Sequence, residues 1–115
     1  MAINFETADS QKLLSAFKDK IRQGHIVTWS CDPDGDFTHT AEQWKYQAWM
    51  RPVLYRGQLT MNFIGNSRAT KPMREIYAIY HGRFIESMLA HCDDLFTNAT
   101  ATALATAGDK IPAAA

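Results

Sequence analysis

The 115-residue sequence lacks several features that would point to a particular environment or partner. Its only cysteines, Cys31 and Cys92, form no CxxC pair, so neither a disulfide framework nor a zinc finger is indicated. No apolar stretch is long enough to cross a bilayer, and the first residues show no basic segment followed by an apolar run. We therefore expect a cytoplasmic protein without a membrane partner.

An excess of charge of one sign is also lacking. The 12 Lys and Arg residues balance the 12 Asp and Glu residues, which removes the general electrostatic argument for a nucleic-acid partner. A basic strip interleaved with Trp49 and Tyr55 has the composition of a surface for single-stranded nucleic acid. Its members are Arg51, Arg56, Arg68, Lys71, Arg74 and Arg83. Zero net charge and the nearby acidic segment make nucleic acid the less favoured partner.

Two segments have the apolar period of amphipathic helices. In residues 7–24, Thr7 or Asp9 can cap the start and Gly24 can end the helix. Its apolar positions are Leu13, Leu14, Phe17 and Ile21. Residues 71–94 predict a longer helix with Pro72 in its first turn.

The longer helix carries two adjacent apolar stripes. One consists of Ile76, Tyr80, Phe84 and Met88, and the other of Ala78, Gly82, Ile85, Leu89 and Cys92. So wide an apolar surface predicts a largely buried helix. Gly82 costs roughly 1 kcal/mol relative to alanine inside a helix, so we interpret it as marking the close approach of another backbone.

Residues between the helices alternate as strands do. Residues 25–31 predict a strand with Val27, Trp29 and Cys31 on one face. Residues 43–65 predict a hairpin whose two-residue loop is formed by Arg56 and Gly57.

The hairpin loop fixes the register, with Tyr55 opposite Gln58 and Leu54 opposite Leu59. The face with a core composition then holds Trp44, Tyr46, Ala48, Met50, Leu54, Leu59, Met61 and Phe63. The other face holds Lys45, Gln47, Trp49, Arg51, Val53, Tyr55, Gln58, Thr60 and Asn62. Because proline has no N–H group, Pro52 predicts an edge or a bulge at that point.

Together these elements predict an α+β fold in two layers. An antiparallel sheet of three or four strands carries two helices, in the order α-β-β-β-α, with a C-terminal strand as an option. The helices cover the face that holds Trp44, Leu59 and Phe63. Residues 1–104 form one domain, and the Ala- and Thr-rich residues 105–115 form a flexible tail.

The segment DPDGDFTHTAE, residues 32–42, has the acidic spacing of a calcium loop without its full ligand set. An EF-hand needs glycine at its sixth position and glutamate at its twelfth, where this chain has Phe37 and Gln43. Pro33 and Gly35 suit a tight turn, and aspartates accept hydrogen bonds from nearby N–H groups. We interpret the segment as a structural connection between strands and assign no metal site, with a weak calcium site as the alternative.

No catalytic motif or glycine-rich phosphate loop is present, so no catalytic residue and no cofactor are assigned. Two kinds of tertiary pairing remain open. A thiol pair would join Cys31 to His39 or His91, and an acid–base pair would join Glu75 or Glu86 to His81.

The function that we favour is a non-catalytic binding or assembly module. Trp49, Arg51 and Tyr55 lie at alternate positions on the second hairpin face, and their residue types are enriched among interface hot spots. We predict that they bind a second copy of the chain or another protein. The opposing interpretation is that the tail or the Asp-rich loop covers Trp49 within the monomer. The alternative function is a small hydrolase-like enzyme, with a site among the Asp-rich loop, His39 and the second helix.

Overall fold

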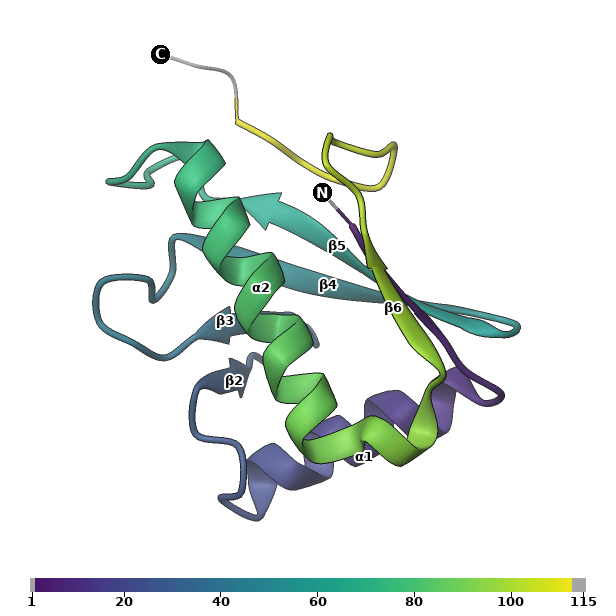
Figure 1. Cartoon of the computed structure of the whole chain (residues 1–115). Coiled ribbons are helices and arrows are strands. Elements are labelled where there is room, and N and C mark those ends of the chain that lie inside the picture. Colours follow the sequence, from purple (N-terminus) through teal and green to yellow (C-terminus); the bar gives the residue numbers. More distant parts are fainter. Residues whose placement is uncertain (1, 113–115) are drawn as a thin grey trace.

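The computed structural model describes residues 2–112, which form an α+β fold with a six-stranded antiparallel sheet (Figure 1). The elements are β1 (Ile3–Glu6), α1 (Ser10–Arg22), β2 (Trp29–Cys31), β3 (Phe37–His39), β4 (Ala48–Tyr55), β5 (Gln58–Gly65), α2 (Met73–Cys92), a 3₁₀ turn η1 (Asp93–Leu95) and β6 (Asn98–Ala101). The strand order is β2-β3-β4-β5-β1-β6. The α+β class is confirmed, whereas the predicted three or four strands and their order understate the sheet.

The sequence pattern did not predict two of the strands. β1 lies in the interior of the sheet, between β5 and β6, and β3 extends the Asp-rich loop towards β4. Both have only three or four residues, which is too short for a clear alternation of apolar and polar positions. The optional C-terminal strand is confirmed as β6, which pairs with β1.

The hairpin of β4 and β5 has the predicted register. Tyr55 pairs with Gln58 and Leu54 with Leu59, and Gly57 adopts a φ of +81° in the loop. Phe37, the first residue of β3, pairs with Met50, so β3 does not extend along β4 past Met50. Beyond that pair β4 has a neighbouring strand on one side only, and this confirms the edge position predicted from proline at residue 52.

Three assignments near the strands are wrong. Trp44 and Tyr46 lie in a turn that precedes β4, not in the strand. Trp44 is still buried in the core as expected, whereas Tyr46 has a φ of +61° and is 56% exposed. Leu54 is also exposed, because the end of the hairpin extends past the helices (Figure 1). β2 begins only at Trp29, so Val27 precedes the strand and is exposed.

The first helix matches its predicted signals more closely than the second. Asp9 caps α1 by accepting a hydrogen bond from the Lys12 N–H at 3.0 Å, and Gly24 follows the helix end with a φ of +79°. α2 begins at Met73, one residue after Pro72, so proline is its N-cap and does not lie in its first turn.

The second apolar stripe of α2 is only partly in the core: Cys92 is buried in it and Ile85 packs against it, whereas the other three positions are not covered. Ala78, Gly82 and Leu89 are exposed, and a Cβ atom on Gly82 would meet no atom within 4 Å. The reason is that α2 packs against the sheet with one side, and within residues 2–112 no further layer covers the other side. Gly82 therefore marks no close approach of another backbone among the described residues.

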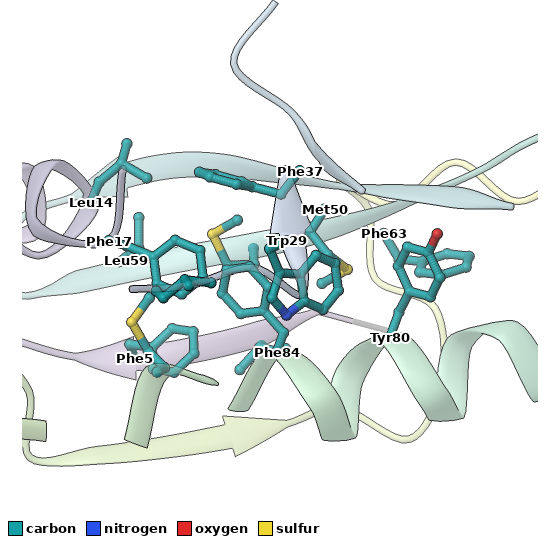
Figure 2. Packing of buried hydrophobic residues seen from close by; sticks show 14 of the residues in the cluster. Phe5, Leu14, Phe17, Trp29, Phe37, Met50, Leu59, Phe63, Tyr80 and Phe84 are labelled. Atoms are coloured by element: carbon teal, nitrogen blue, oxygen red, sulfur yellow. The ribbon is translucent and has the colours of Figure 1, made fainter. Parts of the chain in front are cut away.

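Both helices cover the same face of the sheet, around an aromatic core (Figure 2). The Phe84 ring of α2 lies 4.9 Å from Phe17, 5.0 Å from Trp29, 5.9 Å from Phe37 and 6.1 Å from Phe5, measured between ring centroids. The cluster joins both helices to strands β1, β2 and β3. The prediction that helices cover the face of Leu59 and Phe63 is confirmed.

After β6 the chain returns to the sheet. The Lys110 N–H donates to the Phe63 carbonyl at 2.9 Å, and the Gly65 N–H donates to the Lys110 carbonyl at 2.8 Å. Of the predicted tail over residues 105–115, the last three residues lie outside the described part. In that described part, no helix is long and apolar enough to span a membrane.

Candidate binding face of the sheet

The sheet has one face without helices, and it carries the three predicted binding residues. Side chains alternate between the faces of a strand. Since Ala48 and Met50 point into the core, the odd-numbered residues of β4 from Trp49 to Tyr55 point the other way. This helix-free face comprises Trp49, Arg51, Val53 and Tyr55 of β4, Gln58, Thr60, Asn62 and Ile64 of β5, and Asn4 and Glu6 of β1.

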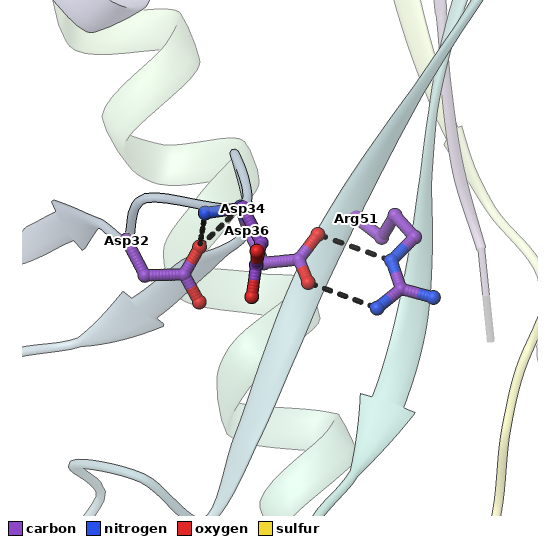
Figure 3. A network of polar contacts seen from close by, with 4 residues as sticks. All are labelled: Asp32, Asp34, Asp36 and Arg51. Atoms are coloured by element: carbon purple, nitrogen blue, oxygen red, sulfur yellow. Dashed lines mark hydrogen bonds and ion pairs between the residues drawn. The ribbon is translucent and has the colours of Figure 1, made fainter.

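Arg51 is held in place by the last aspartate of the Asp-rich loop (Figure 3). Its Nε donates to Asp36 Oδ1 at 3.1 Å and its Nη2 to Asp36 Oδ2 at 3.0 Å. This two-point geometry orients the guanidinium, and the hydrogen bond raises the pKa of Arg51. The Asp36 side chain is 9% exposed and that of Arg51 is 42% exposed, so the pair lies at the boundary between sheet and solvent.

The remaining aspartates of the loop serve its own turn. Asp32 Oδ1 accepts from the Asp34 N–H at 3.0 Å and from the Asp36 N–H at 2.9 Å, and Gly35 has a φ of +89° (Figure 3). The loop connects β2 to β3, as predicted. Within residues 2–112 no three His, Cys, Asp or Glu side chains are grouped as a metal site. Calorimetric titration with calcium would test whether the loop binds this ion.

Neither the tail nor the Asp-rich loop buries the whole helix-free face. The tail reaches it beside Ile64, the cross-strand partner of Trp49, through a bridge to Lys110, and Trp49 is partly buried. The loop reaches it at Arg51. Tyr55, farther along β4, is 52% exposed. The face is therefore bordered by these segments and open along β4.

Polar side chains form a network in the middle of the face. Thr60 Oγ1 donates to Asn4 Oδ1 at 2.8 Å, and Gln58 Nε2 lies 3.1 Å from the same oxygen and 2.8 Å from Thr60 Oγ1. Asn4 was absent from the predicted face because β1 was not predicted. The signal for it was the alternation in INFE, residues 3–6, where two apolar and two polar residues share four positions.

The histidine of the predicted hydrolase-like site lies on the other face. His39 is buried, with its Nδ1 accepting from the Ala41 N–H at 3.0 Å and its Nε2 3.3 Å from Arg83 Nη1. Burial lowers the pKa of His39, Arg83 lowers it further, and Glu86 acts in the opposite direction. Asp36, in contrast, binds Arg51 of the helix-free face. The Asp-rich loop and His39 therefore do not converge on one site.

Cys31 and His39, one of the pairings left open by the sequence, lie at different positions of the β2–β3 pair. Cys31 lies beside Lys18 and Asp32, two positions along β2 from Trp29, which is the residue that pairs with His39. Burial raises the pKa of the Cys31 thiol, which disfavours the reactive thiolate. His81 packs against the rings of Tyr77 and Phe63, and Glu86 raises the pKa of His39.

Comparison of the chain with protein-family models, with curated proteins and with solved structures finds no significant match. Its function is therefore inferred from the geometry of its own surface.

Proposed function

We propose that the protein is a non-catalytic binding or assembly module that associates with a second copy of itself through the helix-free face. The observation that carries this proposal is the alignment of Trp49, Arg51 and Tyr55 along β4 on a face that no helix covers. Tryptophan, tyrosine and arginine supply most interface hot spots. A sheet face also offers a self-complementary patch for the two-fold dimers that are commonest among soluble proteins.

The charges on this face suit an approach of two identical surfaces. Arg51 is neutralised by Asp36 of the same chain, so that two copies would not bring unpaired guanidinium groups together. The ion pair also fixes the Arg51 side chain before association, which lowers the entropic cost of ordering it in an interface. Polar threonine and amide side chains surround the aromatic residues, as in the rim of many interfaces.

We further propose a cytoplasmic location and a protein partner. Both cysteines are free thiols, which supports a reducing cytoplasm. The helix-free face carries Glu6 and the Arg51–Asp36 pair and is not a continuous basic surface, so a protein partner fits it better than nucleic acid.

Sedimentation equilibrium of the parent, Trp49→Ala and Leu89→Ala tests the proposal. Leu89 is a matched control because it is a large exposed apolar residue on α2, away from the helix-free face. The parent should reach twice the monomer mass of 13.0 kDa. Trp49→Ala should weaken the dimer about 30-fold, the factor that corresponds to a hot spot of roughly 2 kcal/mol. Leu89→Ala should dissociate like the parent.

A parent that remains monomeric at about 1 mM, the weak end of specific association, removes the homodimer. A dimer that is weakened by Leu89→Ala and not by Trp49→Ala places the interface on α2.

The alternative, a small hydrolase-like enzyme, is favoured by one observation. His39 is a buried histidine with a lowered pKa next to Arg83, and such perturbed groups are more frequent at catalytic sites. A screen with chromogenic esters and phosphate esters would detect a general hydrolase. Activity that is lost in His39→Gln and retained in Trp49→Ala would support the enzyme over the binding module.

A further inference from the structure

The helix-free face contains a hollow of about 290 Å³ between β5, β1 and the returning tail. Its floor is formed by Asn4, Gln58, Thr60 and Asn62, with Tyr55 at one end and Gly108 in its wall. We propose that this hollow, the amide trough, binds an uncharged polyhydroxylated ligand such as a single sugar ring. The proposal does not depend on self-association, since it rests on side chains of β1 and β5 and on the tail.

Asn62 is the first reason to expect a ligand. Its residue is only 7% exposed, and its side-chain amide makes no hydrogen bond to any residue of the described chain. The amide opens onto the hollow, so its donor and its acceptor are accessible to water or to a ligand there. A ligand in the trough would supply both a donor and an acceptor to this amide.

The neighbouring side chains are already oriented by one another. Asn4 Oδ1 is used by Thr60 and Gln58, which leaves the Asn4 Nδ2 donor and the Gln58 Oε1 acceptor available to the hollow. The floor therefore offers donors and acceptors in alternation along two strands. A hydroxyl group both donates and accepts, so a ligand rich in hydroxyls matches this arrangement.

The wall of the trough is built by specific contacts. Asp109 Oδ1 accepts from the Phe63 N–H at 2.8 Å, and its Oδ2 accepts from the Thr106 N–H at 2.7 Å, which closes a turn over residues 106–109. A Cβ atom on Gly108 would lie 2.5 Å from Asn62 Nδ2, so only glycine allows the turn to lie directly against the amide. The turn thus encloses Asn62 in a preformed site.

The residues that line the hollow favour one class of ligand over others. Among residues 2–112, no Lys, Arg, Asp or Glu side chain lines the hollow, so the described lining offers no ionic partner to a phosphate or a carboxylate. A nucleobase presents its polar atoms along its edge and gains much of its affinity from stacking. The only aromatic ring in the lining is Tyr55 at one end, whereas the polar groups are spread along the floor. A sugar ring, with hydroxyls around it and an apolar C–H face for Tyr55, fits both features.

A second hollow adjoins the amide trough. This hollow of about 460 Å³ shares Asn4 and Gln58 with the trough and extends towards the turn between β4 and β5. A ligand of more than one sugar unit could therefore follow the groove between β1 and β5.

The test is an NMR titration of ¹⁵N-labelled protein, which observes the side-chain amides of Asn4, Gln58 and Asn62 directly. The probes are glucose, galactose, mannose, N-acetylglucosamine and maltose, with adenosine and uridine as the competing class. At least one sugar should give saturable shifts centred on Asn62 and Gly108. Titrations in Trp49→Ala as well as the parent prevent a dimer from hiding the trough.

Asn62→Leu, which keeps the side-chain volume and removes the amide, should weaken sugar binding at least tenfold. It should leave the melting temperature of the ligand-free protein within a few degrees of that of the parent, because it removes no side-chain hydrogen bond within residues 2–112. Gln11→Leu, at an exposed position of α1, is the matched control and should leave binding unchanged. If Asn62→Leu does not fold, Asn4→Ala provides the same binding comparison.

Three results would overturn the proposal. One is the absence of saturable shifts for every sugar up to about 50 mM, beyond the millimolar range of weak specific binding. The second is preferential binding of adenosine or uridine at the same resonances. The third is a loss of stability in Asn62→Leu with sugar binding retained, which would make Asn62 a structural residue.

Discussion

On the helix-covered face of the sheet, Phe84 is enclosed by four aromatic rings, whereas on the helix-free face Tyr55 is half exposed and the Asn62 amide lines a polar hollow. Burial of apolar surface accounts for the first face. It does not account for the second, because an exposed tyrosine and a hollow lined by polar side chains bury little apolar surface. The contrast separates residues that stabilise the fold from residues that we propose to bind.

The largest effect is expected from breaking the helix-covered face. Phe84→Ala should lower the free energy of unfolding by roughly 3 to 5 kcal/mol, because it leaves a cavity between two helices and the sheet. Val27→Ala, at a position that is 72% exposed, is the control and should change it little. Urea denaturation measures both. A Phe84→Ala variant that melts within a few degrees of the parent would show that α2 is peripheral to the core.

A smaller effect is expected at the border of the helix-free face. Removing Arg51 leaves the mostly buried Asp36 carboxylate without its partner, and we expect Arg51→Ala to destabilise by about 1 to 2 kcal/mol after allowance for solvent screening. The exposed pair of Arg22 and Asp19 on α1 is a matched control, for which Arg22→Ala should have almost no effect. Equal effects of the two substitutions would mean that the Asp36 pair contributes no more than a surface pair.

A still smaller effect is expected from the protonation of His39, which lies on the helix-covered face. Burial and Arg83 hold the pKa of His39 below its ordinary value of 6.5, so the unfolded chain takes up the proton first as the pH falls. Stability from the neutral ring is fully present above about pH 6.5 and is lost as the pH falls from there towards the folded pKa. In His39→Gln the melting temperature should therefore decrease less between about pH 7 and pH 5 than it does in the parent.

The control for this series is His25→Gln, an exposed histidine after α1, which should preserve the slope of the parent. An unchanged slope in His39→Gln would show that His39 is not protonated more readily in the unfolded chain.

The smallest effect is expected from calcium. Asp32 and Asp36 already use their carboxylates in the turn and in the pair with Arg51, so calcium should produce no specific heat in calorimetric titration. A chelator should leave the melting temperature unchanged. Binding tighter than about millimolar, the weak end for loop sites, would contradict the structural interpretation of the loop.

The sequence was most informative where local rules determine the structure. The hairpin register followed from a two-residue loop with Gly57, and the start of α1 followed from the Asp9 cap. Because side chains alternate along a strand, the same register placed Trp49, Arg51 and Tyr55 on one face. β1 and β3 could not be predicted because they are short and depend on pairing with residues that are distant in sequence, such as Ile3 with Met61.

The composition of α2 was misleading for a physical reason. Two adjacent apolar stripes suggest a largely buried helix, but a single sheet covers only one side of a helix and leaves part of the second stripe outside. Ala78 and Leu89 face solvent as a result. The amide trough was equally out of reach, since it needs β1 beside β5 and a tail whose Gly108 returns to Asn62.

The most direct test of the proposed self-association is a dilution series followed by backbone amide NMR shifts. We predict that the shifts that change with concentration cluster on β4 at Trp49, Arg51, Val53 and Tyr55 and on their β5 partners, and that Trp49→Ala suppresses them. Shifts that instead cluster on the exposed side of α2 or along the outer edge of β6, or spectra that do not change with concentration, would contradict self-association through the helix-free face.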